Sequence, residues 1–242
     1  MNIKKDLLSI NKYSRPGEKL KSVKGIVVHW VANPNTYAKA NRDFFENRKY
    51  GEMGYGSAHY IIDLNGDIIQ CIPLSEIAYH VGADSYKEEA IKKLGNYPNN
   101  TTIGIECTHI DWDGKMTEET YNSLVELCKD LCLTYKLNPL TDLYRHYDIT
   151  GKDCHKWFVD NLDEWEKFKN KVRDKMINNN KEIQKNIIYK NIVNFDFEGE
   201  KFGVPGFLKE GISYVQVRGL LDRLGYIVEW DNESKTVIIK KE

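Results

Sequence analysis

Residues 143–154 read LYRHYDITGKDC and contain a histidine and a cysteine eight positions apart, His146 and Cys154. Far upstream, the apolar run GIVVHW at residues 25–30 has the composition of a strand and carries a second histidine, His29. Neutral imidazole and thiolate are ligands that zinc prefers, and a catalytic zinc site combines three protein ligands with one position for water. The sequence therefore predicts a zinc site formed by His29, His146 and Cys154.

These residues also have a simpler interpretation. A single histidine in an apolar strand, such as His29, is more often a hydrogen-bonded core residue than a metal ligand. Residues 146–154 are harder to explain as core, because they combine charged side chains with Thr150-Gly151, a composition that favours a loop. Loops carry functional residues more often than they carry core. The spacing alone leaves the metal undecided.

The composition is that of an ordinary globular protein. The chain has 242 residues, enough for one large domain or for a domain of usual size with a small one. Apolar residues make up 41% and charged residues 29%, as in soluble domains. A net charge of −1 gives no global attraction to nucleic acids or anionic membranes. We therefore expect no nucleic-acid partner.

The sequence shows neither a secretion signal nor a membrane span. Residues 1–12 contain lysines but no apolar segment of signal-peptide length. No run approaches the roughly 18 apolar residues that a membrane-spanning helix needs. We expect a protein that is made in the cytoplasm, does not insert into membranes, and reaches any target outside the cell by another route.

The five cysteines form no disulfide framework. Cys128 and Cys132 lie four positions apart on a predicted helix, where they share one face and suit the core. Cys71 and Cys107 lie in strand-like runs and are also expected in the core. Only Cys154 has polar neighbours typical of a functional site.

The first 176 residues alternate between strand-like and helix-like segments. Runs rich in β-branched residues predict strands at residues 24–31, 58–64, 67–72 and 101–108. Apolar periodicity predicts helices at residues 36–47, 118–135 and 162–176. This alternation favours an α/β domain in which a central mixed β-sheet is flanked by helices.

Individual residues refine these segments. Asn65-Gly66 is a strong hairpin signal between two of the strands. Asn35 and Thr117 are suitable N-caps for the helices that follow them. The helix residues expected to face the core are Ala38, Phe44, Phe45, Trp165 and Phe168.

The composition changes after residue 176. Residues 177–186 are polar and predict a linker, helical or extended. Residues 187–242 predict a small α+β domain with a turn at Glu198-Gly199 and another at Asp231-Asn232. Its predicted elements are strands at 187–195, 226–230 and 236–240, a strand after the first turn, and a helix at 213–224.

Five short motifs occur in a fixed order along the first domain. They are IVVHW (26–30), SAHYIID (57–63), AYHVG (78–82), IGIE (103–106) and HYDITGKDC (146–154). Together they resemble the type 2 N-acetylmuramoyl-L-alanine amidases, a family of phage endolysins and bacterial autolysins that is related to the peptidoglycan recognition proteins. The resemblance covers about the first 176 residues and implies that family's fold.

The resemblance also assigns roles to residues. It implies that His29, His146 and Cys154 bind Zn²⁺, because the last two have the family's spacing. Glu106 occupies the place of a catalytic glutamate, and Lys152 that of a catalytic lysine. By the residues alone, Glu106 could instead be a paired structural carboxylate and Lys152 a solvated loop lysine.

Other positions are less decided. His80 resembles a histidine that lines the substrate groove, although a core role is equally compatible with its neighbours. His59 is expected to pack rather than react, and Ala58 stands where some relatives place a catalytic tyrosine. Asp148 and Asp153 are two candidates for orienting a ligand histidine. No role is assigned to His109 or His155.

The activity implied by the resemblance is hydrolysis of the amide bond between N-acetylmuramic acid and L-alanine in bacterial peptidoglycan. A phage or prophage endolysin of a Gram-positive, clostridial-like host fits best, and would act on the cell wall after its release. The alternatives are a bacterial autolysin of the same chemistry, a peptidoglycan-binding protein without catalysis, and a zinc amidohydrolase with another substrate.

Residues 187–242 resemble a different family. The segments VPG (204–206), YVQVR (214–218), LGYIVEWD (224–231) and KTVII (235–239) are similar to the small N-terminal domain of copper amine oxidases. The stretch contains no histidine or cysteine, so no copper site is expected. A tether to the cell wall is the favoured role, and the alternative is a structural or self-associating domain.

Overall fold

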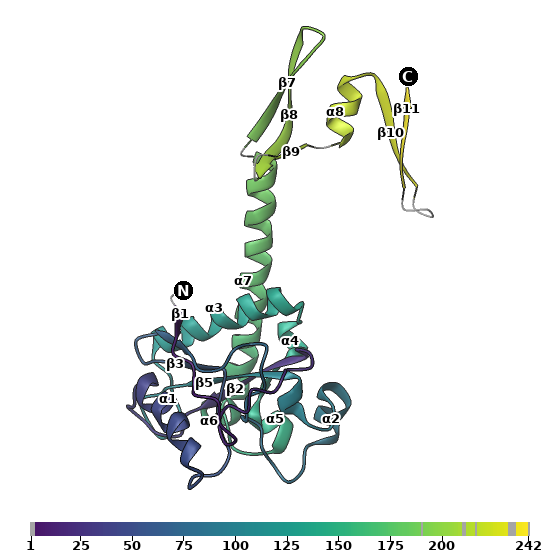
Figure 1. Ribbon diagram of the computed structural model, residues 1–242. Coiled ribbons are helices and arrows are strands. Elements are labelled where there is room, and N and C mark those ends of the chain that lie inside the picture. The colour runs from purple at the N-terminus through teal and green to yellow at the C-terminus, as the bar shows by residue number, and fades with distance from the viewer. Residues whose placement is uncertain (1–2, 190, 210–211, 216, 232–235, 242) are drawn as a thin grey trace. The chain divides into compact units, whose positions relative to one another are not determined.

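The computed structural model describes residues 3–189, 191–209, 212–215, 217–231 and 236–241. The chain divides into two compact units, residues 1–176 and residues 177–242 (Figure 1). The division falls within one long helix, α7 (Leu162–Tyr189).

A six-stranded mixed sheet forms the centre of the first unit. Its strands are ordered β1-β4-β3-β5-β2-β6. Neighbouring strands are parallel except for β3 and β4, which form the antiparallel hairpin that Asn65-Gly66 predicts. The strands are β1 (Ile3–Lys5), β2 (Gly25–Trp30), β3 (Tyr60–Ile62), β4 (Ile68–Gln70), β5 (Thr102–Cys107) and β6 (Leu143–Arg145). The predicted mixed sheet is thus confirmed, and two short strands, β1 and β6, are added to it.

Helices cover both faces of this sheet. The long ones are α1 (Ala38–Asn47), α3 (Glu118–Tyr135) and α7. The short ones are η1 (Arg48–Tyr50), α2 (Glu88–Leu94), η2 (Pro98–Asn100), α4 (Pro139–Asp142), α5 (His146–Thr150) and α6 (Lys156–Asp160). Helix α3 has the predicted bounds and the predicted cap, since the Thr117 hydroxyl accepts a hydrogen bond from Thr120 N at 3.0 Å.

Alternation along the strands sorts side chains between the two faces. Ile26 and Val28 of β2 pack in one cluster with the buried faces of α3 and α7, where Trp165 and Phe168 point inward as predicted. Val27 packs in a separate cluster on the opposite face. A strand has a period of two residues, so His29 lies on the same face as Val27. The opposite face therefore carries the candidate site.

Helix α1 covers part of the site face, and two expectations about it are wrong. It begins after Tyr37, which makes no side-chain cap, while Asn35 has a positive φ of 58° and its side chain donates to Ile110 O at 2.8 Å. Ala38 and Phe45 are buried as predicted, but Phe44 is 45% exposed. The sequence pattern cannot separate two adjacent phenylalanines when only one can face the sheet.

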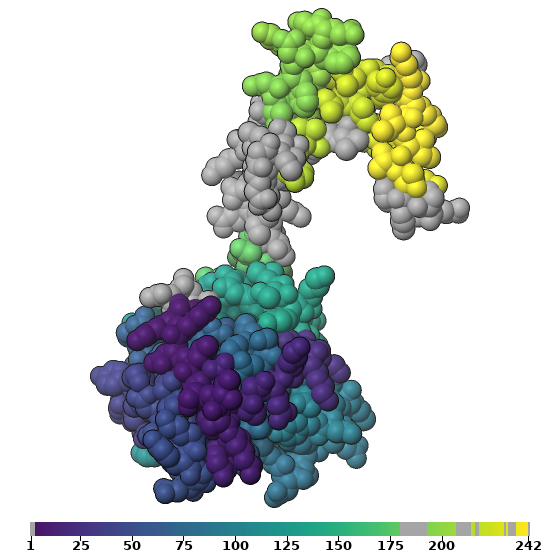
Figure 2. Space-filling model, viewed as in Figure 1, coloured from purple at the N-terminus to yellow at the C-terminus, as the bar shows by residue number. Residues whose placement is uncertain are grey.

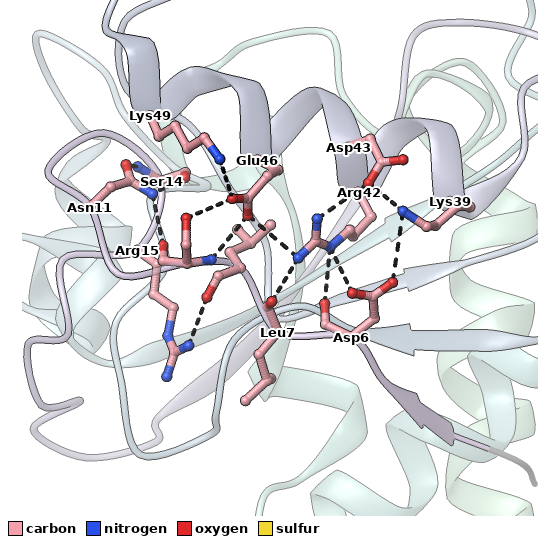
Figure 3. A network of polar contacts seen from close by, with 12 residues as sticks. Asp6, Leu7, Asn11, Ser14, Arg15, Lys39, Arg42, Asp43, Glu46 and Lys49 are labelled. Atoms are coloured by element: carbon pink, nitrogen blue, oxygen red, sulfur yellow. Dashed lines mark hydrogen bonds and ion pairs between the residues drawn. The ribbon is translucent and has the colours of Figure 1, made fainter.

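A polar network attaches the N-terminal segment to α1 (Figure 3). The Arg42 guanidinium donates to the carbonyls of Asp6 and Leu7 at 3.1 and 2.6 Å. The Glu46 carboxylate accepts from both the N–H and the hydroxyl of Ser9, at 3.0 and 2.6 Å, and pairs with Lys49 at 3.0 Å. Figure 2 shows this segment, in purple, lying on the surface of the first unit. The network thereby fixes α1 beside the site.

The second unit contains two small sheets and one helix. Strands β7 (Asn191–Phe197), β8 (Glu200–Lys209) and β9 (Ile212–Val215) form an antiparallel sheet. Strands β10 (Tyr226–Asp231) and β11 (Thr236–Lys241) form an antiparallel pair that follows α8 (Val217–Arg223).

The boundaries of the second unit differ from the predicted ones. Residues 187–189 are helical rather than extended, because α7 continues through the polar segment. Residues 213–215 belong to β9 rather than to the predicted helix. Asn232, predicted at a turn, lies outside the described residues. Among the described residues, no helix is both long and apolar enough to cross a membrane.

Candidate metal centre

Three parallel strands deliver the central residues of the site to one edge of the sheet. His29 lies opposite Glu106 in the parallel register of β2 and β5. Strand β6 pairs with β2 on its other side and ends at Arg145, directly before His146. Parallel strands place their carboxyl ends at the same edge, which is where α/β sheets commonly bind ligands. The topology therefore brings residues about 40 to 120 positions apart in sequence into one site.

A tight turn after β6 then brings Cys154 to the same place. Residues 146–150 form the short helix α5, where a loop was predicted. Asp148 stabilises its first turn by accepting from Arg145 N at 2.8 Å and pairing with the Arg145 guanidinium at 2.6 Å. Gly151, with φ of 84°, ends the helix. The returning chain is held by a 2.7 Å hydrogen bond from Tyr147 N to Cys154 O.

His29, His146 and Cys154 form one buried cluster, as the sequence predicts. Their ligand atoms all lie within 4.8 Å of one another, and each residue is at most 4% exposed. The Cys154 sulfur is 3.6 Å from His29 Nδ1, close to the roughly 3.5 Å edge of a tetrahedron with ordinary Zn–S and Zn–N bonds. The buried His146 Nε2 has no hydrogen-bond partner in the described structure. Donor chemistry and spacing therefore fit a zinc ion.

Burial keeps the two imidazoles of the cluster in the neutral form that a metal ligand needs. Burial lowers the pKa of His29 well below its usual value, with His146 adding to the shift. Burial lowers the pKa of His146 to about 4, so both imidazoles are neutral near pH 7. Burial also raises the pKa of the Cys154 thiol. A bound divalent ion would reverse that effect, because it stabilises the thiolate directly.

Glu106 lies beside the cluster with an unsatisfied carboxylate. Its Oε2 is inaccessible to solvent and has no hydrogen-bond partner in the part of the chain that the structure describes. Burial raises the pKa of Glu106 to about 8, although Lys152 lowers it in part. Lys152 itself is exposed at the rim of the same pocket. A raised carboxyl pKa next to a cation is typical of a general acid or base.

Two connected pockets open over the cluster. The larger has a volume of about 530 Å³ and the smaller about 210 Å³. Both are lined by Glu106, His146 and Lys152. Arg48 also lines both; the larger is further lined by Tyr55, Tyr79, Tyr97 and Asn99, and the smaller by His29, Cys154, Trp30 and Phe44. An extended substrate can therefore lie in the groove on both sides of the cluster.

Some of these groove residues were not recognised in the sequence. Arg48 begins η1, directly after α1, and donates to the carbonyls of Met53, Gly54 and Tyr55 in the glycine-rich segment that follows. Tyr55 packs against Tyr79 with ring centroids 5.4 Å apart. The nearest sequence signal is the set of glycines at 51, 54 and 56, which favours a loop but does not indicate what the loop borders.

The remaining histidines and carboxylates are placed as follows. His59 is buried and bonded to Gly104 N and Glu76 O, each at 3.0 Å, as expected for a packing residue. Among the hydrogen bonds and ion pairs of the described residues, Asp148 pairs with Arg145 and Asp153 with Lys156. Neither carboxylate is bonded there to a ligand histidine, so these contacts give no support to an orienting role for Asp148 or Asp153. His80, by contrast, is within 3.0 Å of His29.

Comparison with known proteins identifies the family. Residues 19–157 match the N-acetylmuramoyl-L-alanine amidase family, which is more than half of the chain. The chain belongs to this family. Members are typically zinc-dependent, consistent with a cluster here that could bind a metal ion. Residues 164–242 match the copper amine oxidase N-terminal domain family. Both resemblances inferred from motifs are thus confirmed.

Individual relatives of this amidase-family protein are bacterial. N-acetylmuramoyl-L-alanine amidase BlyA of Bacillus subtilis (strain 168) is 35% identical over 175 residues, which are 70% of this chain and 46% of BlyA. N-acetylmuramoyl-L-alanine amidase CwlL of Bacillus licheniformis is 32% identical over 225 residues, 93% of this chain and 59% of CwlL. The chain spans about half the length of these curated relatives.

Solved structures share the fold of the first unit. The catalytic domain of XlyA has a TM-score of 0.54 and 25% identity, covering 71% of this chain and 99% of that one. The catalytic domain of PlyG has a TM-score of 0.58 at 23% identity, covering 73% of this chain and 96% of that one. The α/β architecture with a mixed sheet and flanking helices is therefore that of the amidase catalytic domains.

Proposed function

We propose that this protein is a zinc-dependent N-acetylmuramoyl-L-alanine amidase that cleaves the amide bond between N-acetylmuramic acid and L-alanine in peptidoglycan. The observation that carries the proposal is the unpaired Glu106 carboxylate beside the buried cluster of His29, His146 and Cys154. The family match and the relatives named as amidases support the same reaction. A binding protein without catalysis would not need an unpaired carboxylate at the floor of its groove.

The three ligand residues would hold the ion, which when bound supplies a Lewis acid that activates water and polarises the substrate carbonyl. Glu106 accepts the proton of the attacking water at its carboxylate and returns it to the leaving amine of L-alanine. The Lys152 ammonium, at the rim of both pockets, stabilises negative charge developing on the carbonyl oxygen. Three tyrosines, Tyr55, Tyr79 and Tyr97, line the larger pocket and offer aromatic surface to the substrate.

The groove gives a physical reason for a substrate with a chain on each side of the bond. The two pockets meet at Glu106, His146 and Lys152, so a bond cleaved there has one half in each pocket. A muramoyl-alanine amide joins a sugar to a peptide, so its sugar can lie in one pocket and its peptide in the other. The host is proposed to be Gram-positive, because the curated relatives come from Bacillus species.

The direct test is digestion of purified Gram-positive peptidoglycan with and without a chelator, followed by mass analysis of the products. New L-alanine amino termini on intact glycan strands, lost on chelation and restored by Zn²⁺, support the proposal. Binding to the wall without cleavage would place the protein with the peptidoglycan-binding relatives. Cleavage of another bond would keep the metal centre and replace the substrate.

For the second unit we propose a tether to the cell wall, which would raise the local concentration of the catalytic unit at its substrate. Its match to a separate domain family supports an independent role. Removal of residues 177–242 should leave cleavage of soluble muropeptides unchanged and reduce lysis of whole walls. Unchanged lysis would reject the tether, and sedimentation of both forms would then test the alternative of self-association.

A further inference from the structure

The ring of His29 contacts protein atoms through both of its nitrogens. Nδ1 faces the Cys154 sulfur at 3.6 Å, on the side of the metal cluster. Nε2 lies 3.0 Å from Nδ1 of His80, whose ring is perpendicular to it. A neutral imidazole has one N–H, so the position of that proton decides which nitrogen can bind a metal ion. The hydrogen bonds beyond His80 settle this position.

The chain of hydrogen bonds ends at a backbone carbonyl. The Thr102 hydroxyl donates its single hydrogen to Pro98 O at 2.8 Å. Toward His80 Nε2, 3.1 Å away, the same hydroxyl can then only accept. The other neighbour of Nε2, Thr102 O at 3.4 Å, is also an acceptor. The proton of His80 therefore lies on Nε2.

The direction of the remaining bond follows. With its proton on Nε2, the neutral His80 ring has a lone pair on Nδ1, and it accepts from His29 Nε2–H. The lone pair of His29 is then on Nδ1, which faces Cys154. A ligand histidine that donates its second N–H has a fixed tautomer, a fixed ring orientation and a higher basicity.

His80 is itself held firmly in position. The Asn99 side-chain oxygen accepts from the backbone N–H groups of His80 and Val81 at 3.1 and 3.0 Å. The His80 ring lies against Gly104 of β5, where an added Cβ would come within 2.5 Å of the ring. Any larger residue at position 104 would displace the ring. Gly104 thus leaves room for the His80 ring, and Asn99 holds the His80 backbone in place.

We propose that His80 is a positioning residue of the metal centre, which fixes His29 in the tautomer that presents Nδ1 to the ion. The proposal rests on the proposed metal centre, and it revises the substrate-binding role that the sequence suggested for His80. Both ring nitrogens of His80 are engaged by His29 and Thr102, so neither is free to bind substrate. His80 contributes only ring surface to the groove.

The first measurement is the protonation of His29 in the zinc-free protein, read from the nitrogen chemical shifts and two-bond couplings of its imidazole. We expect the proton on Nε2 and the lone pair on Nδ1. A proton on Nδ1 would overturn the proposal. This readout does not depend on activity, so it separates the failure of this inference from the failure of the proposed amidase function.

The second measurement is zinc affinity, determined by competition with a chromogenic chelator. His80→Phe keeps a ring but loses the acceptor, and should weaken zinc binding about 10- to 100-fold, as is usual for loss of an orienting partner. His80→Gln supplies an oxygen acceptor and should recover part of the loss. A KM increase at unchanged zinc affinity in His80→Phe would instead identify a substrate-binding residue and overturn the proposal.

A matched pair of variants at Thr102 tests the hydrogen bond between Thr102 and His80. Thr102→Ser keeps the hydroxyl and should bind zinc as the wild type does. Thr102→Val removes the hydroxyl at nearly constant shape and should weaken zinc binding and mix the two tautomers of His29. Equal zinc affinity and the same His29 tautomer in the two variants would reject the hydrogen-bond chain from Thr102 through His80 to His29. This test holds even if His80→Phe does not fold.

Discussion

Two glutamates of the first unit have opposite environments. Glu46 accepts two hydrogen bonds from Ser9 and pairs with Lys49 (Figure 3). Burial alone would raise its pKa, but these partners lower the pKa of Glu46 to about 2. Glu106 has a buried oxygen with no partner among the described residues, and burial raises its pKa to about 8. The same side chain is thus satisfied at one site and unsatisfied at the other.

The difference separates structural from functional polar groups. A buried polar atom without a partner costs about 1–3 kcal/mol or more, so each one calls for an explanation. The Glu46 network attaches the N-terminal segment to α1 and needs no other molecule. The unpartnered atoms of Glu106 and His146 lie beside the cluster, where an ion, water and substrate would complete them. Mutations should therefore affect stability at the first site and chemistry at the second.

The largest effect is expected for the proposed metal ligands. Cys154→Ser replaces a thiolate by a hydroxyl, a much weaker zinc ligand, and should reduce zinc from about one ion per chain to a small fraction. Elemental analysis after dialysis measures this directly. Cys128→Ser is the matched control, because Cys128 is also buried but lies on the core-facing side of α3. It should lower stability and keep zinc, and a normal metal content in Cys154→Ser would refute the ligand set.

The next effect is on turnover. Glu106→Gln keeps the shape of the side chain but removes the base, and should lower kcat about 100-fold or more with zinc content unchanged. Without bound metal, the free energy of unfolding should change little near pH 7, because burial raises the pKa of Glu106 to about 8 and its carboxyl is then mostly neutral, as the amide is. Glu46→Gln is the control and should leave kcat unchanged. Comparable turnover in wild type and Glu106→Gln would remove the general base from the mechanism.

A smaller effect, on stability alone, is expected at the network. Arg42 is 9% exposed and bonds to the carbonyls of Asp6 and Leu7. Arg42→Met should lower the free energy of unfolding of the first unit by about 1–2 kcal/mol, because the partly buried carbonyls and the nearby acids lose their donor. Urea denaturation of residues 1–176 measures this change. Arg42→Lys keeps the charge without the planar fork and should recover only part of it.

The sequence predicts local features of this protein better than long-range ones. Thr117 and the hairpin at Asn65-Gly66 act through neighbours a few residues away, so their patterns were sufficient. Phe44 and Phe45 differ only in which one meets the sheet, and this depends on tertiary packing. The polar stretch after β6 was expected as a loop, but Asp148 caps a short helix there.

In the candidate site, too, some features could be predicted from the sequence and others depend on the fold. The sequence alone suggested a cluster of His29, His146 and Cys154, which the fold brings together. The contact between His29 and His80 could not be predicted, because it joins residues 51 positions apart and depends on the placement of an asparagine and a glycine. The carboxylates nearest in sequence to the ligands were the expected orienting groups, and they pair with Arg145 and Lys156 instead.

The smallest expected effect is the pH dependence of stability that Glu46 causes at low pH. The pKa of Glu46 is about 2 in the folded protein, below the usual value near 4.3 of an unfolded chain. Its contribution to stability is therefore complete above about pH 5 and is lost as the pH falls toward 2. We expect Glu46→Gln to reduce the stability of residues 1–176 by about 1 kcal/mol at pH 6, a value discounted for partial solvent screening. The difference from wild type should shrink as the pH approaches 2, and a difference constant over that range would show that Glu46 stabilises the unit by packing rather than by its charge.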